Sequence, residues 1–316
     1  MDSGAANGGT SSNPPSCAPG AGMTTCPAGN GNESCCTSLQ VPGGVFYRTY
    51  ADNDAGQIDE ADPATVSGFR LDKYLVTVGR FRQYVRAWNG GWVPSSGSGK
   101  HAHLNGGQGL VNSANPSSYE PGWQTSDNSN VAPTGGNLGC SQDSAWTTSA
   151  GSQENLPINC VNWYEAYAFC IWDGGFLPSE AEWEYAAAGG SQQRRYPWGS
   201  ASPGMSNQYA IYGCYYPNGA GTCSGVMNLA PVGTAPAGLG AWGQLDLAGE
   251  LFEKNLDWSA AFTLCTDCAY TTPTSVRVSH GGSFHVAATD LLPTYRNAQV
   301  PTNRGHSTGV RCARTP

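Results

Sequence analysis

Charged residues are scarce in this sequence, and basic residues especially so. Asp, Glu, Lys and Arg make up 12% of its 316 residues, and the 15 Lys and Arg are scattered without forming a basic run. With a formal net charge of −8, the chain is poorly suited to neutralise a phosphate backbone, so we expect no nucleic-acid partner. Long apolar runs are also missing. None approaches the roughly 18 residues that span a bilayer, so we expect no transmembrane segment.

Glycine, proline and cysteine are abundant by contrast. The 43 Gly and 21 Pro predict a backbone dominated by turns and irregular segments, with few long helices. The 12 cysteines, an even number, favour disulfides, because cytosolic thiols stay reduced. We therefore expect an extracytoplasmic protein, whether secreted, periplasmic or lipid-anchored at the cell surface. The alternative is a cytosolic protein with unpaired, buried cysteines.

The N-terminal segment differs from the rest of the chain. Residues 1–38 form a Gly, Ser and Pro-rich linker that is typical of the polar tether following a removed export signal. Four cysteines interrupt this linker: Cys17, Cys26, Cys35 and Cys36. We expect them to form a small disulfide knot docked on a domain of residues 39–316. A metal-binding knuckle is the alternative, although no histidine lies nearby.

Three helices are predicted from their caps and their periodicity. The first begins after Thr77 and ends at Asn89-Gly90, and its apolar residues fall at i, i+3, i+4 and i+7: Phe81, Tyr84, Val85 and Trp88. The second lies in "NWYEAYAFCIWDGG". The third lies in "LPSEAEWEYAAAGG", where Ser179 and Glu182 form a capping box. Residues 89–155 are expected to be irregular, and residues 190–316 to form short strands and turns.

Five segments carry a family resemblance. They are "FRLDKYLVTVGRFRQYV", "LPINCVNWYEAYAFCIWDGGFLPSEAEWEYAAAGG", "RYPWG", "DLAGELFEKNLDW" and "RVSHGGSFHVAA…YRNAQVPTNRGHSTGVRCA". In this order and spacing the chain resembles the formylglycine-generating enzyme, or sulfatase-modifying factor, family over residues 41–316. The resemblance implies an α+β fold, a single compact C-type-lectin-like domain with few short helices and strands and much irregular structure.

The founding members of that family use two cysteines to bind Cu(I) and, with O₂, oxidise a sulfatase cysteine to formylglycine. Those cysteines follow the Ser of a G-G-S motif, at positions that in this chain are Val286 and Leu291. Neither side chain binds copper, which as Cu(I) prefers soft thiolate ligands. We therefore expect no copper and no formylglycine-generating oxidase activity.

The other cysteines are expected to be structural. The family pattern pairs Cys170 with Cys312. Local spacing favours Cys214 with Cys223 and Cys265 with Cys268, and elimination leaves Cys140 with Cys160. The alternative for "CTDC" is a redox centre, but its Thr-rich, loop-like surroundings favour a structural bridge.

A calcium site is implied by "DLAGELFE", which matches the family's oxygen-ligand loop. Asp246 and Glu253 would contribute carboxylates, and Gly249 and Leu251 backbone carbonyls, which are the hard ligands that Ca²⁺ prefers. The alternative is an acidic turn stabilised by Lys254. A second cluster, His101 and His103 in "KHAH", has no third ligand and is interpreted as a polar loop.

These features favour an extracytoplasmic, calcium-stabilised module that binds a protein or a glycan through the former active-site face. Irregular backbone rich in polar, aromatic and Arg side chains is typical of binding loops. The candidate residues are Ser283, His285, Thr289, Asp290, Tyr295, Arg296, Asn303, Arg304 and His306. Two alternatives remain open: a metal-dependent oxidase or maturation enzyme of the non-haem iron type, and a structural envelope lipoprotein.

Overall fold

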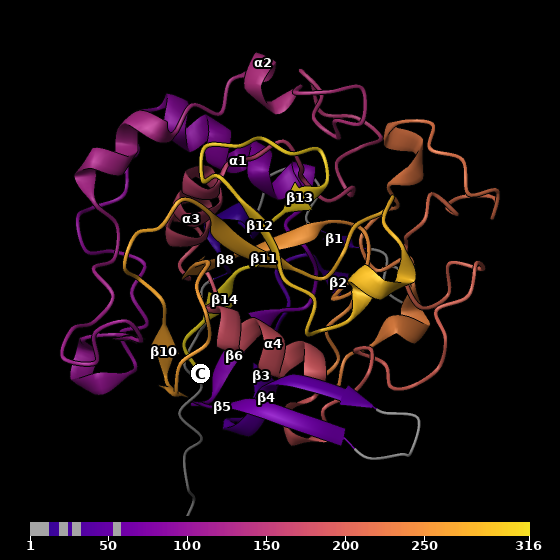
Figure 1. The fold of residues 1–316 in the computed structure, drawn as a ribbon. Coiled ribbons are helices and arrows are strands. Elements are labelled where there is room, and N and C mark those ends of the chain that lie inside the picture. The colour runs from indigo at the N-terminus through magenta and orange to yellow at the C-terminus, as the bar shows by residue number, and fades with distance from the viewer. Residues whose placement is uncertain (1–12, 19–24, 27–32, 53–57) are drawn as a thin grey trace, which may run out of the picture.

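A four-stranded sheet at the centre of the protein joins segments that are far apart in the sequence (Figure 1). The computed structural model describes residues 13–18, 25–26, 33–52 and 58–316. The sheet has the strand order β12 (Asn297–Gln299), β11 (Arg277–His280), β8 (Phe252–Trp258) and β13 (Thr308–Gly309). Every residue of β8 before Trp258 is buried, so this strand is covered on both faces.

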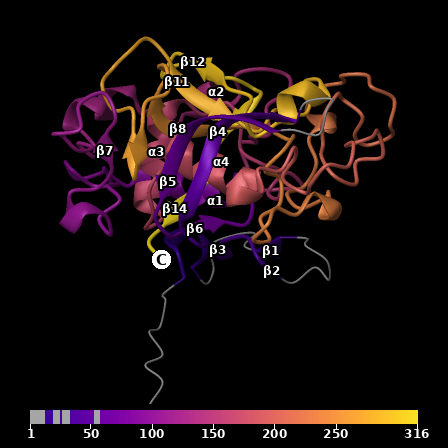
Figure 2. The same cartoon turned by 60° about the horizontal axis from the view of Figure 1, so that its bottom comes forward.

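Helices α3 (Trp163–Trp172) and α4 (Glu180–Ala188) provide that cover. Successive residues of a strand point to opposite faces, and the two helices reach successive residues of β8. Trp183 of α4 donates its indole N–H to Glu253 at 2.8 Å, whereas Trp163 of α3 borders a small cavity with Lys254. Helix α4 also packs on the hairpin of β4 (Gly44–Asp52) and β5 (Ile58–Val66), as Figures 1 and 2 show.

The remaining elements are short. Strands β14 (Ala313–Arg314), β6 (Phe69–Asp72) and β3 (Ser38–Val41) form a sheet, and β9 (Cys265–Thr266) extends the hairpin. Two-stranded pairs are formed by β1 (Thr25–Cys26) with β2 (Glu33–Ser34) and by β7 (Val111–Asn112) with β10 (Cys268–Ala269). The other helices are α1 (Val78–Asn89), α2 (Gly135–Leu138) and 3₁₀ turns at Pro15–Cys17, Asn105–Gly107, Thr125–Asn130, Gly190–Gln192, Val226–Asn228, Pro236–Gly238 and Ala288–Leu291.

The three helices expected from the sequence are confirmed, together with their caps. Thr77 accepts the Arg80 N–H at the start of α1. Helix α3 has a capping box of its own, and Ser179 and Glu182 cap α4 reciprocally as predicted. Gly189 ends α4 with φ 68°, a left-handed conformation that glycine adopts without a Cβ clash.

All twelve cysteines form disulfides. The four pairs expected in the domain are confirmed, namely Cys170–Cys312, Cys214–Cys223, Cys265–Cys268 and Cys140–Cys160. The four N-terminal cysteines pair as Cys17–Cys36 and Cys26–Cys35. Because the longest of these loops spans 142 residues, the bridges restrict the unfolded chain strongly.

The segment before β3 contacts the core through a buried polar group. Arg80 donates to Ser16 Oγ at 3.0 Å and forms ion pairs with Asp72 and Asp173 at 3.0 and 2.6 Å. Asp173 also accepts the Ser16 N–H at 3.0 Å. Both arginine and carboxylates are fully buried, which is stable only because they are paired. Within the part of the chain that the structure describes, no helix is both long and apolar enough to cross a membrane.

Candidate functional site

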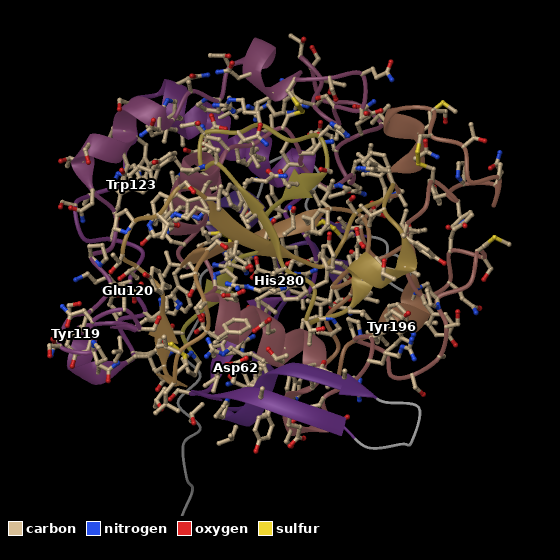
Figure 3. All side chains as sticks on the ribbon, viewed as in Figure 1. Asp62, Tyr119, Glu120, Trp123, Tyr196 and His280 are labelled. Carbon is tan, nitrogen blue, oxygen red and sulfur yellow. A yellow bond between two sulfur atoms is a disulfide. The ribbon has the colours of Figure 1, made fainter. Side chains whose placement is uncertain are left out.

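Apolar side chains fill the two positions that the sequence resemblance assigns to the copper cysteines. Leu291 is 1% exposed and belongs to a buried cluster with Tyr196 and Tyr212, and Val286 packs against the same cluster. Tyr196 is labelled in Figure 3, close to the yellow 3₁₀ turn that ends at Leu291. Since every cysteine of the chain is in a disulfide, no thiolate is left to replace them.

Ser283, His285 and His306 lie together beside this cluster. Ser283 Oγ lies 3.3 Å from His285 Nδ1, and the rings of His285 and His306 are 5.4 Å apart. His306 Nε2 in turn lies 3.7 Å from Asp143 Oδ2. Burial and the neighbouring His306 lower the pKa of His285. Three of the candidate residues therefore lie close together, and Asp143, which was not among the candidates, lies next to them.

The two arginines among the expected binding residues form ion pairs with buried carboxylates. Arg304 holds Glu165 with two of its nitrogens, and Arg296 holds Glu180 in the same way. Both carboxylates are buried, and a buried carboxylate needs such a partner. Arg296 also lies 4.4 Å from the ring centre of Phe262. Their guanidinium groups are thus already engaged.

The other expected residues lie at the surface. Tyr295 is 37% exposed and stacks on Phe252 at 6.2 Å. Asp290 accepts the Thr289 hydroxyl at 2.9 Å, and exposed Asn303 donates to Gln299 Oε1 at 3.2 Å. Thr289, Tyr295 and Asn303 are exposed and Asp290 is half-buried, so a ligand can reach them from solvent.

A groove opens directly after Leu291. It has a volume of about 540 Å³ and is lined by the three residues that follow, Leu292, Pro293 and Thr294, by the segment after α4, and by Tyr50 of β4. Among the described residues that line it, the charged side chains are Arg194 and Arg195. Arg195 is exposed, so the groove offers positive charge to a ligand. The sequence did not reveal it, because its walls come from segments more than 90 residues apart.

The predicted calcium loop is buried and acidic. Burial raises the pKa of Asp246 to about 6 against the opposing charge of Arg311, and burial and Asp246 together raise the pKa of Glu250 well above its usual value. Asp246 accepts the Gly233 N–H at 2.8 Å, and neither it nor Glu250 forms an ion pair with a described residue. Two buried carboxylates that form no ion pair with a described residue fit a hard cation such as Ca²⁺.

The alternative in which Lys254 stabilises that acidic turn is wrong. Lys254 points to the other face of β8, where its Nζ donates to Thr308 Oγ1 at 2.8 Å. Burial lowers the pKa of Lys254 to about 7, although Glu165 opposes the shift. Glu253 is instead neutralised by Arg311.

The interpretation of "KHAH" as a polar loop also needs correction. His101 is fully buried between two carboxylates, with Nδ1 3.0 Å from Glu120 and Nε2 2.9 Å from Glu182. Burial alone would lower the pKa of His101, but the two carboxylates outweigh it and raise the pKa to about 10. Glu120, labelled in Figure 3, comes from the irregular segment that could not be divided into elements from the sequence.

Comparison with known proteins is consistent with this geometry. A family model described as the sulfatase-modifying factor enzyme 1-like domain matches residues 25–316. The chain belongs to this family. It is 30% identical over 299 residues to the formylglycine-generating enzyme of Thermomonospora curvata, covering 88% of this chain and 93% of that enzyme. It is also 30% identical over 304 residues to hercynine oxygenase of Mycolicibacterium smegmatis, covering 88% of this chain and 61% of that enzyme.

Solved structures support the fold of this family member. PvdO from Pseudomonas aeruginosa has a TM-score of 0.54 at 20% identity, covering 88% of this chain and 94% of that one. Treponema denticola variable protein 1 has a TM-score of 0.52 at 20% identity, covering 88% and 95%. Likeness at this identity shows the fold alone. The expected α+β, single-domain architecture is confirmed.

Proposed function

We propose that this family member has lost copper-dependent cysteine oxidation and binds an anionic protein or glycan ligand outside the cytoplasm. The observation that carries the proposal is the environment of Leu291, which occupies a copper-cysteine position and is buried among Tyr196, Tyr212 and other apolar groups. A Cu(I) site needs soft ligands within reach. Apolar packing supplies none, and the disulfides hold every sulfur of the cysteines.

The groove beside Leu291 is the proposed binding site. Its volume, about 540 Å³, lies in the range of ordinary ligand pockets. Tyr50 offers a ring, and the described polar groups of the wall include Gln192, Arg194, Arg195 and Thr294. Both charged groups are cations, so a ligand that carries carboxylate or sulfate is favoured electrostatically. An acidic peptide segment and an acidic glycan share this chemistry.

Calcium is proposed as a structural ion at the loop of residues 246–253. Asp246 would hold it with a carboxylate oxygen, and Gly249 and Leu251 with backbone carbonyls. Both oxygens of Glu253, the other carboxylate of the predicted set, are already bound by Arg311 and Trp183. When bound, the ion would supply the positive charge that the buried carboxylates of Asp246 and Glu250 lack. The loop contacts the start of the segment that leads to the groove, because Gly249 donates its N–H to the Gly281 carbonyl and Phe284 donates its N–H to the Glu250 carbonyl. Fixing the loop would therefore also fix the start of the 281–294 segment.

An oxidising location is proposed from the disulfides. Six bridges use all twelve cysteines, a pattern that persists in secreted, periplasmic or cell-surface proteins. Residues 1–12, the first part of the predicted tether, lie outside the described residues.

Binding to panels of defined ligands tests this function. The panels are acidic and neutral glycans and acidic and neutral peptides, each measured at two salt concentrations. We expect the protein to bind acidic members of one panel, with affinity that falls as salt rises, and to lose this binding in Arg194→Ser/Arg195→Ser. The matched control is Arg86→Ser, since Arg86 is exposed on α1, outside the groove. Binding that survives loss of both groove arginines, or no preference for acidic ligands, would overturn the proposed site.

A further inference from the structure

A buried group of three metal-ligating side chains lies between α4 and the central sheet. Glu180 and Glu184 are one turn apart on α4, and His280 is the last residue of β11. His280 is labelled at the centre of Figure 3, next to α4. His280 Nε2 lies 3.0 Å from Glu180 Oε1 and 3.9 Å from Glu184 Oε1. Among the described residues, this is the one group of three or more His, Cys, Asp or Glu whose ligand atoms all lie within 4.8 Å of one another.

Three polar atoms of the group are buried without a hydrogen-bond partner. Both carboxylate oxygens of Glu184 are buried without one, and so is Nδ1 of His280. Glu184 is 2% exposed and His280 is 0% exposed. Burying a carboxylate that nothing satisfies is costly. A structure that keeps Glu184 in this place therefore needs either a proton or a cation on it.

The surrounding charges leave room for a cation. Glu180 is paired with Arg296, and Asp257 accepts the N–H of Glu180 at 2.7 Å. Arg48, Arg296 and Asp257 are the other charged groups that act on Glu184. Three carboxylates and two guanidinium groups leave one net negative charge around the three side chains, which favours a positively charged occupant.

The separations of His280 Nε2 from the two carboxylates are similar to those between ligand atoms around one zinc ion. Zinc binds imidazole nitrogen and carboxylate oxygen at about 2.0–2.2 Å, so tetrahedral ligand atoms lie roughly 3.4 Å apart. The two separations from His280 Nε2, 3.0 and 3.9 Å, lie on either side of that value. Trp183 stacks on the His280 ring with centres 5.1 Å apart, and this contact fixes the plane of the imidazole.

We propose that Glu180, Glu184 and His280 bind one divalent first-row transition cation of the Zn²⁺ or Mn²⁺ class. An imidazole with two carboxylates suits such ions and disfavours Ca²⁺, which takes oxygen ligands. Because the three side chains are at most 3% exposed, the ion is enclosed and its role is structural. It ties α4 to β11 immediately before the segment that carries the groove, and it is distinct from the calcium loop.

Metal analysis of the full chain tests the site. Protein produced in medium supplemented with zinc and manganese is purified without chelator and analysed by plasma mass spectrometry. We expect about one equivalent of Zn²⁺ or Mn²⁺ in the wild type, and less than a tenth of that in Glu184→Gln and His280→Gln. Asp246→Asn, in the calcium loop, and His103→Gln keep the ion. His103 is the matched control because its ring nitrogens are also buried without partners.

A second measurement covers variants that fold poorly. X-ray absorption at the metal edge of the wild type should show only nitrogen and oxygen ligands, with the outer-shell scattering of a single imidazole. If the purified wild-type protein contains no transition metal, the proposal is overturned, and the buried Glu184 carboxyl carries a proton instead. A full equivalent in folded Glu184→Gln, or a spectrum with sulfur or several imidazoles, overturns it as well.

Discussion

Arg311 forms a bidentate ion pair with Glu253, in which Nε lies 2.8 Å from Oε2 and Nη2 lies 2.7 Å from Oε1. Both side chains are almost wholly buried, at 0% and 1% exposure. The same guanidinium donates to the carbonyl oxygens of Asp72, Lys73 and Leu245. This one side chain therefore connects β8, β6 and the calcium loop.

Arg311→Met should destabilise the protein by about 3–5 kcal/mol, because it leaves Glu253 buried and unpaired. Urea unfolding with the disulfides intact measures the change. Arg86→Met, which alters an exposed side chain on α1, should change stability by less than about 0.5 kcal/mol. If Arg311→Met changes the free energy of unfolding as little as Arg86→Met does, the Arg311–Glu253 ion pair does not stabilise the fold.

His101 should make stability depend on alkaline pH. Its pKa is about 10 in the folded protein against an ordinary value of 6.5, so the folded state binds its proton more tightly. The stabilisation is complete below pH 6.5 and is lost as the pH rises through 10. His101→Gln should be less stable than the wild type at neutral pH. Its stability should also fall less between pH 7 and 10 than that of the wild type. Thermal unfolding across that range checks this, and a wild-type profile that stays flat there would contradict the buried ion pairs.

Calcium should raise the melting temperature of the wild type relative to protein in a calcium chelator, because an ion bound only by the folded state stabilises it by mass action. Asp246→Asn should remove most of this increment. Asp290→Asn, which alters a carboxylate outside the loop, should retain it. If Asp246→Asn responds to Ca²⁺ as the wild type does, the ion binds elsewhere.

Two kinds of feature could be predicted from the sequence. Some depend on residues close together in the chain, and others follow the motifs of the family that the chain resembles. Ser179 and Glu182 lie three residues apart, and such spacing predicts a helix cap without knowledge of the fold. Cys214 and Cys223 are similarly close in sequence. The pair Cys170–Cys312 spans 142 residues and was predictable only through the resemblance to the family.

What could not be predicted depends on long-range contacts. His101 is paired with Glu182 across 81 residues, and His280 approaches Glu180 across 100. No local periodicity identifies such partners. Glu180 and Glu184 are four residues apart on α4, but similar pairs occur on many solvent-exposed helices, so this spacing alone does not predict a buried site. Arg296 and Arg304 have the composition of binding residues, yet the buried carboxylates that engage them are visible only in the fold.

Incubation of the purified protein with Cu(I), O₂ and a peptide carrying a sulfatase-type cysteine, followed by mass spectrometry, tests the central claim most directly. With apolar side chains at both copper positions, the account predicts unmodified peptide and no Cu(I) retained by the protein. Val286→Cys/Leu291→Cys, which restores two thiols, should gain Cu(I) binding and shows that the correct positions were tested. Conversion of the peptide cysteine to formylglycine by the wild-type protein would contradict the account.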